Sequence, residues 1–288
     1  MDHRKAFTCW CGNDDPQLCF RTPRFGLIRC RSCGCYRIDP PPLQRPSVAG
    51  DFYTQYYSRL SQESLHSTRK QSRYWQVVKQ VSALRQIRHS ALDVGCGDGD
   101  LCYELRQAGW SEVIGQDISR SRIARARVQY PDLQFYDVPL EQTNIPRTSQ
   151  DLVIIDNVIE HVPQPVEFLA TLREYLKPSG LLVAITPNME SGNFRLLGRR
   201  WTPELAPHTH IFLFTHDAIR RCLQLSGFDV IAQGDFYVGT VSPIQILKRV
   251  LKGDLKGGLW RIMQDAGSVY ARLTKSGPML FAAASPCK

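Results

Sequence analysis

Short apolar segments alternate with polar and amphipathic ones through most of the chain. Five apolar segments with the length of buried strands occur between residues 91 and 188, starting with ALDV at 91–94. Residues with helical spacing follow most of them, and strands alternating with helices favour a parallel sheet with crossover helices. The pattern therefore predicts an α/β fold. The five expected strands span 91–94, 112–119, 133–140, 151–162 and 180–188.

Capping residues delimit the expected helices. Ser119 and Thr215 each precede a helical segment, where a hydroxyl can accept a hydrogen bond from a free backbone N–H. Gly109 and Gly227 follow helical segments, where glycine ends a helix at little conformational cost. The expected helices span 98–109, 120–130, 165–180 and 216–228.

Cysteines near the N-terminus have the spacing of a metal site. Six of the ten cysteines lie in the first 35 residues, and CWCG at 9–12 and CRSCG at 30–34 form two close pairs. Two such pairs bring four thiolates to one tetrahedral ion, and four thiolates leave no coordination position open for water. We expect a structural zinc ion in a small zinc ribbon. The expected ligands are Cys9, Cys11, Cys30 and Cys33, with Cys19 and Cys35 as the other candidates.

Changes in composition divide the chain into three parts. The zinc ribbon is expected at 1–40, and a proline-rich and aromatic linker at 41–67. The remaining residues, 68–288, are expected to form the main α/β domain, with a helical insert at about 243–275.

Glycines and acidic residues at successive strand ends predict a nucleotide-type ligand. The loop after the first strand contains Gly95, Gly97 and Gly99, where backbone can approach a ligand closely. Asp93, just before this loop, would repel a pyrophosphate and suits a ligand with an ammonium and a sulfonium group. At the ends of the next two strands, Asp117 is placed to accept hydrogen bonds from ribose hydroxyls and Asp137 from the amine of adenine.

These segments resemble the successive motifs of class I S-adenosylmethionine-dependent methyltransferases. The resemblance rests on LDVGCGDGD, GQDIS, DV at 137–138, DLVIIDNVIEHV and LKPSGLLVAITPN. It implies a Rossmann-like seven-stranded sheet with helices on both faces, including a sixth strand at 228–236 and an antiparallel seventh at 277–285. It also implies that Gly95, Gly97 and Gly99, with Asp93, hold the methionine part of S-adenosylmethionine. Val138 would join Asp137 at the adenine, and Asn157 would lie at the loop side of the cofactor.

Histidines after the fourth and fifth strands are the candidate bases. We expect His161 to be the catalytic base for transfer to a hydroxyl, ahead of His208 and His210 in PHTHIF. The chain also resembles ubiquinone-type O-methyltransferases, in which an arrangement like Asp156, Glu160 and His161 can hold a divalent ion. The motifs of amino-group methylation, N-P-P-Y or D-P-P-Y, do not follow the fourth strand, which favours an oxygen or carbon acceptor.

Several classes of methyl acceptor are consistent with the charge of the chain and with its N-terminal ribbon. The net charge is +9, with 15 basic and 6 acidic residues in 1–90 and 8 basic and 2 acidic residues in 236–288. Bacterial methyltransferases with a similar N-terminal ribbon are associated with saccharides and natural products, which implies a saccharide, a lipid-linked glycan or a related metabolite as acceptor. An rRNA or tRNA methyltransferase is the alternative enzyme, although no base-stacking surface is evident and nucleic acid is the less favoured partner. A non-catalytic cofactor-binding scaffold is the third hypothesis.

The sequence predicts a cytoplasmic protein. No apolar run reaches the roughly 20 residues of a membrane span, and the N-terminus lacks the apolar core of a secretory signal. Residues 244–252 combine apolar positions at helical spacing with a basic flank, and Trp260 follows. This pattern is typical either of a helix packed on the core or of an interfacial helix, which would give peripheral association with the inner membrane surface.

Overall fold

The computed structural model describes residues 9–13, 15–41, 79, 83–84, 88–201, 205–236, 269–271 and 273–287. The linker expected at 41–67 and most of the insert expected at 243–275 lie outside these described residues. In the part of the chain that is described, no helix has the length and apolar character needed to cross a membrane.

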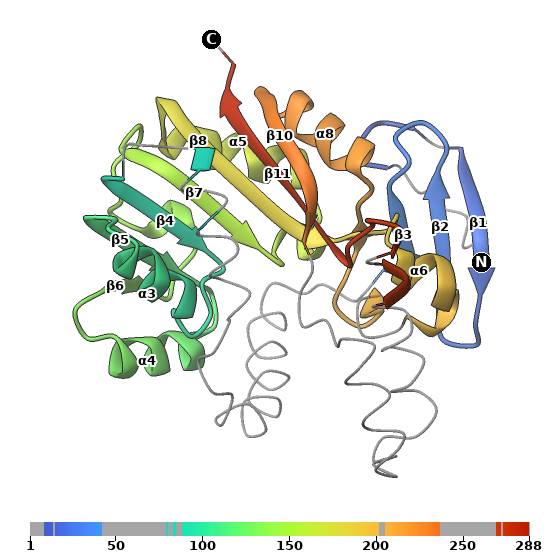
Figure 1. Ribbon diagram of the computed structural model, residues 1–288, viewed down its shortest axis with the longest axis horizontal. Helices are drawn as coiled ribbons and strands as arrows, with labels where there is room; N and C mark the ends of the chain where they lie inside the picture. The colour runs from blue at the N-terminus through green and yellow to red at the C-terminus, as the bar shows by residue number, and fades with distance from the viewer. Residues whose placement is uncertain are drawn as a thin grey trace.

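Seven strands form one sheet in the order β10-β11-β8-β7-β4-β5-β6, which confirms the predicted Rossmann-like α/β fold. The sheet is parallel except for β11, which runs antiparallel between β8 and β10 (Figure 1). The carboxyl ends of the parallel strands therefore meet the start of β11 at one edge, here called the carboxyl edge. The strands are β4 (Ser90–Val94), β5 (Glu112–Gln116), β6 (Gln134–Tyr136), β7 (Gln150–Asp156), β8 (Leu176–Pro187), β10 (Phe228–Phe236) and β11 (Met279–Pro286).

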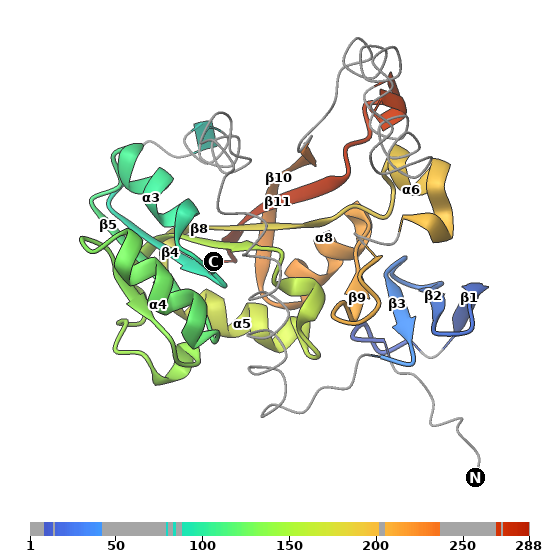
Figure 2. The ribbon, with the colours of Figure 1, turned by 90° about the horizontal axis from the view of Figure 1, so that it is seen from below.

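Helices cover both faces of this sheet. Helices α3 (Asp100–Gln107) and α4 (Arg120–Gln129) pack on the face that contains Ile154 of β7. Helices α5 (Pro165–Tyr175) and α8 (His216–Leu225) pack on the opposite face, which contains Val153 and Ile155 (Figure 2). Neighbouring residues of a strand point to opposite faces, so a strand covered on both sides must be apolar throughout, as β7 is.

Two local predictions were wrong. The helix expected at 165–180 ends at Tyr175, and residues 176–180 begin strand β8 instead. Pro178 explains this end, because proline lacks a backbone N–H and pushes the residue before it out of the helical region. Ser119 occupies the N-cap position of α4, but its hydroxyl contacts the Ser121 hydroxyl rather than a backbone N–H. Thr215 does cap α8, accepting from the N–H of Ala218 at 3.1 Å.

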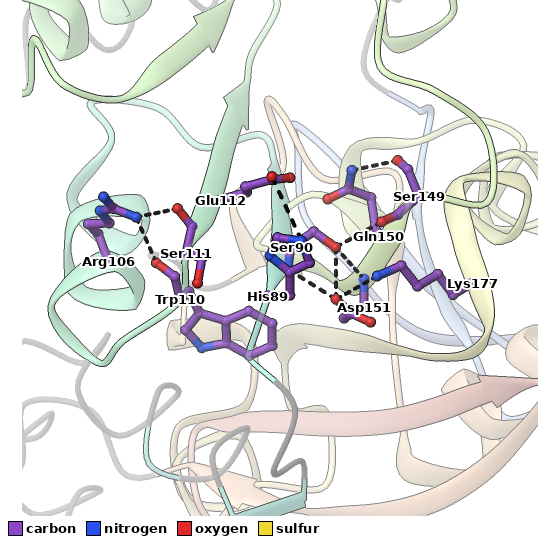
Figure 3. A network of polar contacts seen from close by, with 10 residues as sticks. All are labelled: His89, Ser90, Arg106, Trp110, Ser111, Glu112, Ser149, Gln150, Asp151 and Lys177. Carbon is purple, nitrogen blue, oxygen red and sulfur yellow. Dashed lines mark hydrogen bonds and ion pairs between the residues drawn. The ribbon is translucent and has the colours of Figure 1, made fainter.

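A polar network joins the amino ends of β4, β7 and β8 (Figure 3). The Asp151 carboxylate accepts hydrogen bonds from the N–H and hydroxyl of Ser90 and from the Lys177 ammonium, the last at 2.9 Å. Burial alone would raise the pKa of Asp151, but these hydrogen bonds outweigh it and the pKa is lowered. The network fixes the register of the central strands at the edge opposite the candidate site.

A second, antiparallel sheet contains the N-terminal segment. Strands β1 (Pro16–Arg21), β2 (Gly26–Cys30) and β3 (Tyr36–Asp39) are joined by β9 (Phe212–Leu213), which follows β8 of the large sheet along the chain. This small sheet lies beside α8 at the opposite end of the molecule from β6 (Figure 1). Its apolar core includes Leu27, Ile38 and Leu213. The described elements also include the helix α6 (Gly192–Leu197) and the 3-10 turns η1 (Leu140–Gln142), η2 (Ile159–His161) and η3 (Gly198–Arg200).

Candidate active site and thiolate centre

The glycine loop leaves β4 at the carboxyl edge and has a backbone that only glycine adopts readily. Gly95 and Gly97 have φ angles of +77° and +56°. A Cβ at Gly95 would lie 2.4 Å from a methyl group of Val158, and one at Gly97 would lie 1.9 Å from the Arg122 guanidinium. Both positions thus combine left-handed backbone with close approach of another group. Gly99 is the N-cap of α3, so the loop leads directly into a helix N-terminus.

The carboxylate of Asp117, which follows β5, is attached to this loop. One oxygen accepts from the N–H of Gly97 at 2.9 Å, and the other accepts from the N–H of Ser119 at 2.8 Å. Each carboxylate oxygen has two acceptor positions, so both can still receive a ligand hydroxyl. The structure therefore brings Asp117 and the glycine loop together, as expected for a site that binds a ribose beside a close backbone.

The other expected cofactor residues lie after β6 and β7. Asp137 pairs with Arg127 at 3.1 Å and is partly exposed, and the carbonyl of the adjacent Val138 accepts from the Gln116 side chain at 2.7 Å. Asn157 has a φ of +54°, a conformation that is uncommon for residues other than glycine and that clusters at functional sites.

Asp93 is a buried carboxyl group behind the glycine loop. It is 2% exposed, and its Oδ2 accepts a hydrogen bond from the Cys102 thiol at 3.5 Å. Burial, followed by the nearby carboxyl group of Asp156, raises the pKa of Asp93 to about 8. Neutral Asp93 is therefore the main form at pH 7 until a cation approaches it.

Two of the three candidate histidines meet at the carboxyl edge. The rings of His161, in η2, and His210 pack edge to face with centroids 4.7 Å apart. His161 Nδ1 lies 3.0 Å from the Thr209 carbonyl, which can only accept, so Nδ1 carries the proton and Nε2 the lone pair. Burial lowers the pKa of His161, which favours this neutral form. His208 is exposed and is not a member of the group that His161 and His210 form with Glu160.

A buried glutamate completes this group. Glu160 is fully buried, and its Oε2 accepts from the Thr186 hydroxyl at 3.0 Å. Its Oε1 lies 3.9 Å from His210 Nε2. One ligand atom from each of Glu160, His161 and His210 lies within 4.8 Å of the others. Two imidazoles and a carboxylate are a donor set that suits a divalent transition metal. Among the described residues, His210 completes this set instead of Asp156, the third member expected from the sequence.

The four expected zinc ligands also come together. The Sγ atoms of Cys9 and Cys33 lie 3.6 Å apart, as do those of Cys11 and Cys30, and all four lie within 4.8 Å of one another. Tetrahedral zinc with Zn–S bonds of about 2.3 Å places sulfur atoms about 3.8 Å apart, so the arrangement fits that ion. Hydrogen bonding to Cys9, followed by burial, raises the pKa of Cys33, and a bound cation would offset this cost by stabilising the thiolates. Cys19 is exposed on β1 and, like Cys35, lies outside this group.

One pair of residues at the carboxyl edge, His216 and Asp235, was not predicted from the sequence. His216 Nε2 lies 2.7 Å from an Asp235 carboxylate oxygen, and this hydrogen bond raises the pKa of His216. The same carboxylate accepts from Asn188 and from the N–H of Gly277. The available signals were an acidic residue near the end of a predicted strand and a histidine just after a helix cap.

Comparisons with known proteins find similar sequences among proteins named ubiquinone biosynthesis O-methyltransferase. A ubiquinone biosynthesis O-methyltransferase of Roseobacter denitrificans is 29% identical over 161 residues, which cover 52% of this chain and 64% of that protein. A protein of the same name from Bradyrhizobium diazoefficiens is 36% identical over 123 residues, 41% of this chain and 47% of that protein. The chain thus spans less than two thirds of the length of these relatives.

Solved structures show the same fold. Magnesium protoporphyrin IX methyltransferase from Synechocystis, solved with bound SAH, aligns with a TM-score of 0.57 at 15% identity and covers 84% of this chain and 100% of that chain. A family model described as a methyltransferase domain matches residues 57–233. This match includes the glycine loop, the acidic strand ends and the histidine pair, so the chain belongs to the methyltransferase-domain family.

Proposed function

We propose that the protein transfers a methyl group from S-adenosylmethionine to a hydroxyl group of a small-molecule acceptor. The observation that carries the proposal is the Glu160–His161–His210 group, which meets at the carboxyl edge after β7. Val158, two residues before Glu160, closely approaches Gly95 of the glycine loop. The O-methyltransferase names of the relatives also favour an oxygen acceptor.

The residues at the carboxyl edge fit the parts of the cofactor. Asp117 would bind the ribose hydroxyls, Asp137 the adenine amine, and the glycine loop the methionine part. Asp93 would face the cationic end, where the positive charge of the ligand favours its ionised form. S-adenosylmethionine supplies an electrophilic methyl group on a sulfonium centre.

The Glu160–His161–His210 group would remove the proton of the acceptor hydroxyl. His161 Nε2 would accept it as the acceptor oxygen becomes bonded to the methyl group, because neutral imidazole is the form favoured by burial. Glu160 and His210 would orient the ring and stabilise the positive charge that it gains. A divalent ion held by the same three side chains would instead lower the pKa of the hydroxyl. Metal analysis distinguishes the two, because such an ion would be a second metal equivalent that is lost in Glu160→Gln while the ribbon zinc is retained.

Cofactor binding should release a proton at neutral pH. Asp93 has a pKa of about 8 in the free protein, and a cationic ligand stabilises its ionised form. Below pH 8 the affinity should therefore rise with pH, by up to about tenfold per unit, and level off above pH 8. Calorimetry at pH 6.5 in buffers of different ionisation enthalpy measures the released proton. The control is Asp93→Asn, which has no proton to lose and should bind weakly with no release. Equal proton release by both proteins would contradict the role of Asp93.

His161→Ala should lower kcat at least tenfold, because a positioned general base contributes about 10²- to 10⁴-fold. Affinity for the cofactor should change less than twofold. The acid limb of the wild-type kcat profile should lie below pH 6.5, since the pKa of His161 is lowered from that value and the base must be neutral. The matched control is His89→Ala, an exposed histidine at the amino edge. Full turnover by His161→Ala would assign the role elsewhere, first to His210 and then to His208.

The acceptor is to be sought with labelled S-adenosylmethionine and pooled saccharides, lipid-linked glycans, phenolic lipids and RNA. Label in an alkali-stable ether of a small molecule supports the proposal, and the labelled pool identifies its class. We favour a saccharide or lipid-linked acceptor within this class. Label in RNA would favour the tRNA or rRNA alternative, and cofactor binding with no transfer to any pool would favour the scaffold.

A further inference from the structure

The ribbon that carries the four thiols is hydrogen-bonded to the segment that carries His210. Strand β3 pairs with β9, with Tyr36 opposite Leu213 and Arg37 opposite Phe212. The next N–H along β3, that of Ile38, donates to the Ile211 carbonyl at 3.2 Å. Since β9 begins two residues after His210, the ribbon is attached immediately beside the candidate active site.

Ile211 connects the two sites through its backbone. Its carbonyl accepts from Ile38 of the ribbon, and its N–H donates to the Glu160 carbonyl at 2.8 Å. That N–H belongs to the peptide bond that joins His210 to Ile211, and peptide bonds are rigid planar units. A displacement of β3 would therefore change the position of His210 relative to Glu160 and His161.

Both thiol-bearing loops contact the same part of the catalytic domain. Trp10 lies between Cys9 and Cys11, and its ring stacks on Phe214 with centroids 6.3 Å apart. Ser32 lies between Cys30 and Cys33, and its carbonyl and hydroxyl oxygens accept from Arg221 at 3.2 and 3.1 Å. The thiols of Cys9, Cys30 and Cys33 belong to one buried cluster with Ile211, Phe212 and Phe214. The conformation of each loop, which the bound cation would fix, is thus directly coupled to residues 211–221.

We propose that the four-cysteine centre is a positioning element of the candidate active site, and not only a folding device of the ribbon. When the cation is bound, the ribbon holds residues 210–214 so that His210 lies against Glu160 and His161. When the cation is lost, the β3–β9 pairing loosens and the histidine pair separates. The catalytic consequence rests on the proposed function, whereas the coupling between the thiols and His210 is independent of it.

Hydrogen exchange tests the coupling in the whole chain without an acceptor. Wild-type protein loaded with zinc is compared with the same protein treated with a high-affinity zinc chelator. Exchange in residues 208–214 should rise at least tenfold on chelation, and by as much in Cys30→Ser kept in zinc, which retains any ion held by Glu160, His161 and His210. Exchange in residues 91–117 and affinity for S-adenosylhomocysteine should stay within twofold. Faster exchange confined to residues 16–39 would overturn the proposal, because the ribbon would then have come apart without affecting His210.

Trp10→Ala separates positioning from metal binding. The variant keeps all four thiols and loses the ring that stacks on Phe214, whereas Trp10→Phe retains an aromatic ring there. Cys19→Ser, which removes an exposed thiol of β1, is the matched control. The Cε1–H signals of His161 and His210 are followed by NMR over pH in each protein.

Trp10→Ala should bind a full equivalent of zinc and still change the shift and titration midpoint of His210. Trp10→Phe and Cys19→Ser should both show the wild-type chemical shift and titration midpoint of His210. Identical His210 titrations in zinc-loaded protein, chelated protein and Trp10→Ala would overturn the proposal. Absence of methyl transfer with any acceptor would contradict the proposed function but leave these exchange and NMR results unaffected.

Discussion

Cys30→Ser is expected to abolish zinc binding and to unfold the ribbon while the seven-stranded sheet stays folded. Structural zinc in small domains supplies on the order of 10 kcal/mol of folding free energy. The ribbon has only a small apolar core of its own, because β1 is almost entirely exposed and the core around Leu27 and Ile38 also includes residues from outside the ribbon, such as Leu213. Metal analysis of the purified protein should give about one equivalent of zinc for the wild type and almost none for the variant.

Limited proteolysis measures the second part of this prediction. Cleavage in residues 9–41 of Cys30→Ser should become rapid, while residues 88–201 stay protected. Cys19→Ser is the matched control and should retain zinc and protection, since this exposed thiol lies outside the thiolate group. Stoichiometric disulfides with no metal in the wild type would refute a zinc centre.

Asp117→Ala should weaken binding of S-adenosylmethionine by about 10²- to 10⁴-fold. Two hydrogen bonds from ribose hydroxyls to a carboxylate are worth about 1.5–3 kcal/mol each, and every 1.4 kcal/mol is about tenfold in affinity. The substitution also removes the acceptors for the N–H groups of Gly97 and Ser119, so the glycine loop keeps only the backbone hydrogen bonds of Gly95 and Cys96 to Gln116 of β5. Titration calorimetry with the wild type and the variant measures the loss.

Asp137→Ala is the comparison for this prediction. Its carboxylate is partly exposed and already paired with Arg127, so its removal should cost about tenfold or less. NAD serves as the competing ligand, because its pyrophosphate offers no positive charge that would stabilise the ionised form of Asp93. Affinity for NAD equal to that for S-adenosylmethionine, or unchanged binding by Asp117→Ala, would show that the loop holds another ligand.

The helix boundaries show where sequence reasoning is weakest. Thr215 and Gly227 act as predicted, because a hydroxyl before a helix and a glycine after it respond to the nearest backbone groups. Ser119 has the same local pattern, but its N–H is taken by Asp117 and its hydroxyl by Ser121. Residues 176–180 continue a helical pattern, yet Pro178 and the attraction of Lys177 to Asp151 favour a strand.

Features that depend on local sequence patterns could be predicted without the structure. Buried strands are apolar runs, parallel strands place their carboxyl ends at one edge, and paired cysteines a few residues apart converge on one ion. The parallel part of the sheet, the grouping of Cys9, Cys11, Cys30 and Cys33, and the proximity of Asp117 to the glycine loop follow from these rules, whereas the seven-stranded sheet was expected from the resemblance to class I methyltransferases.

Contacts between side chains that are far apart in the sequence could be identified only from the tertiary structure. Glu160 and His210 are fifty positions apart, and no periodicity relates them, so their contact depends on how the chain returns to the carboxyl edge after β8. The same holds for His216 with Asp235 and for the pairing of β3 with β9. Such contacts form when apolar side chains from distant segments pack into one core. Here the ribbon and α8 contribute to the same core. For this reason a ribbon that resembles an independent module in sequence packs directly beside the candidate catalytic histidines.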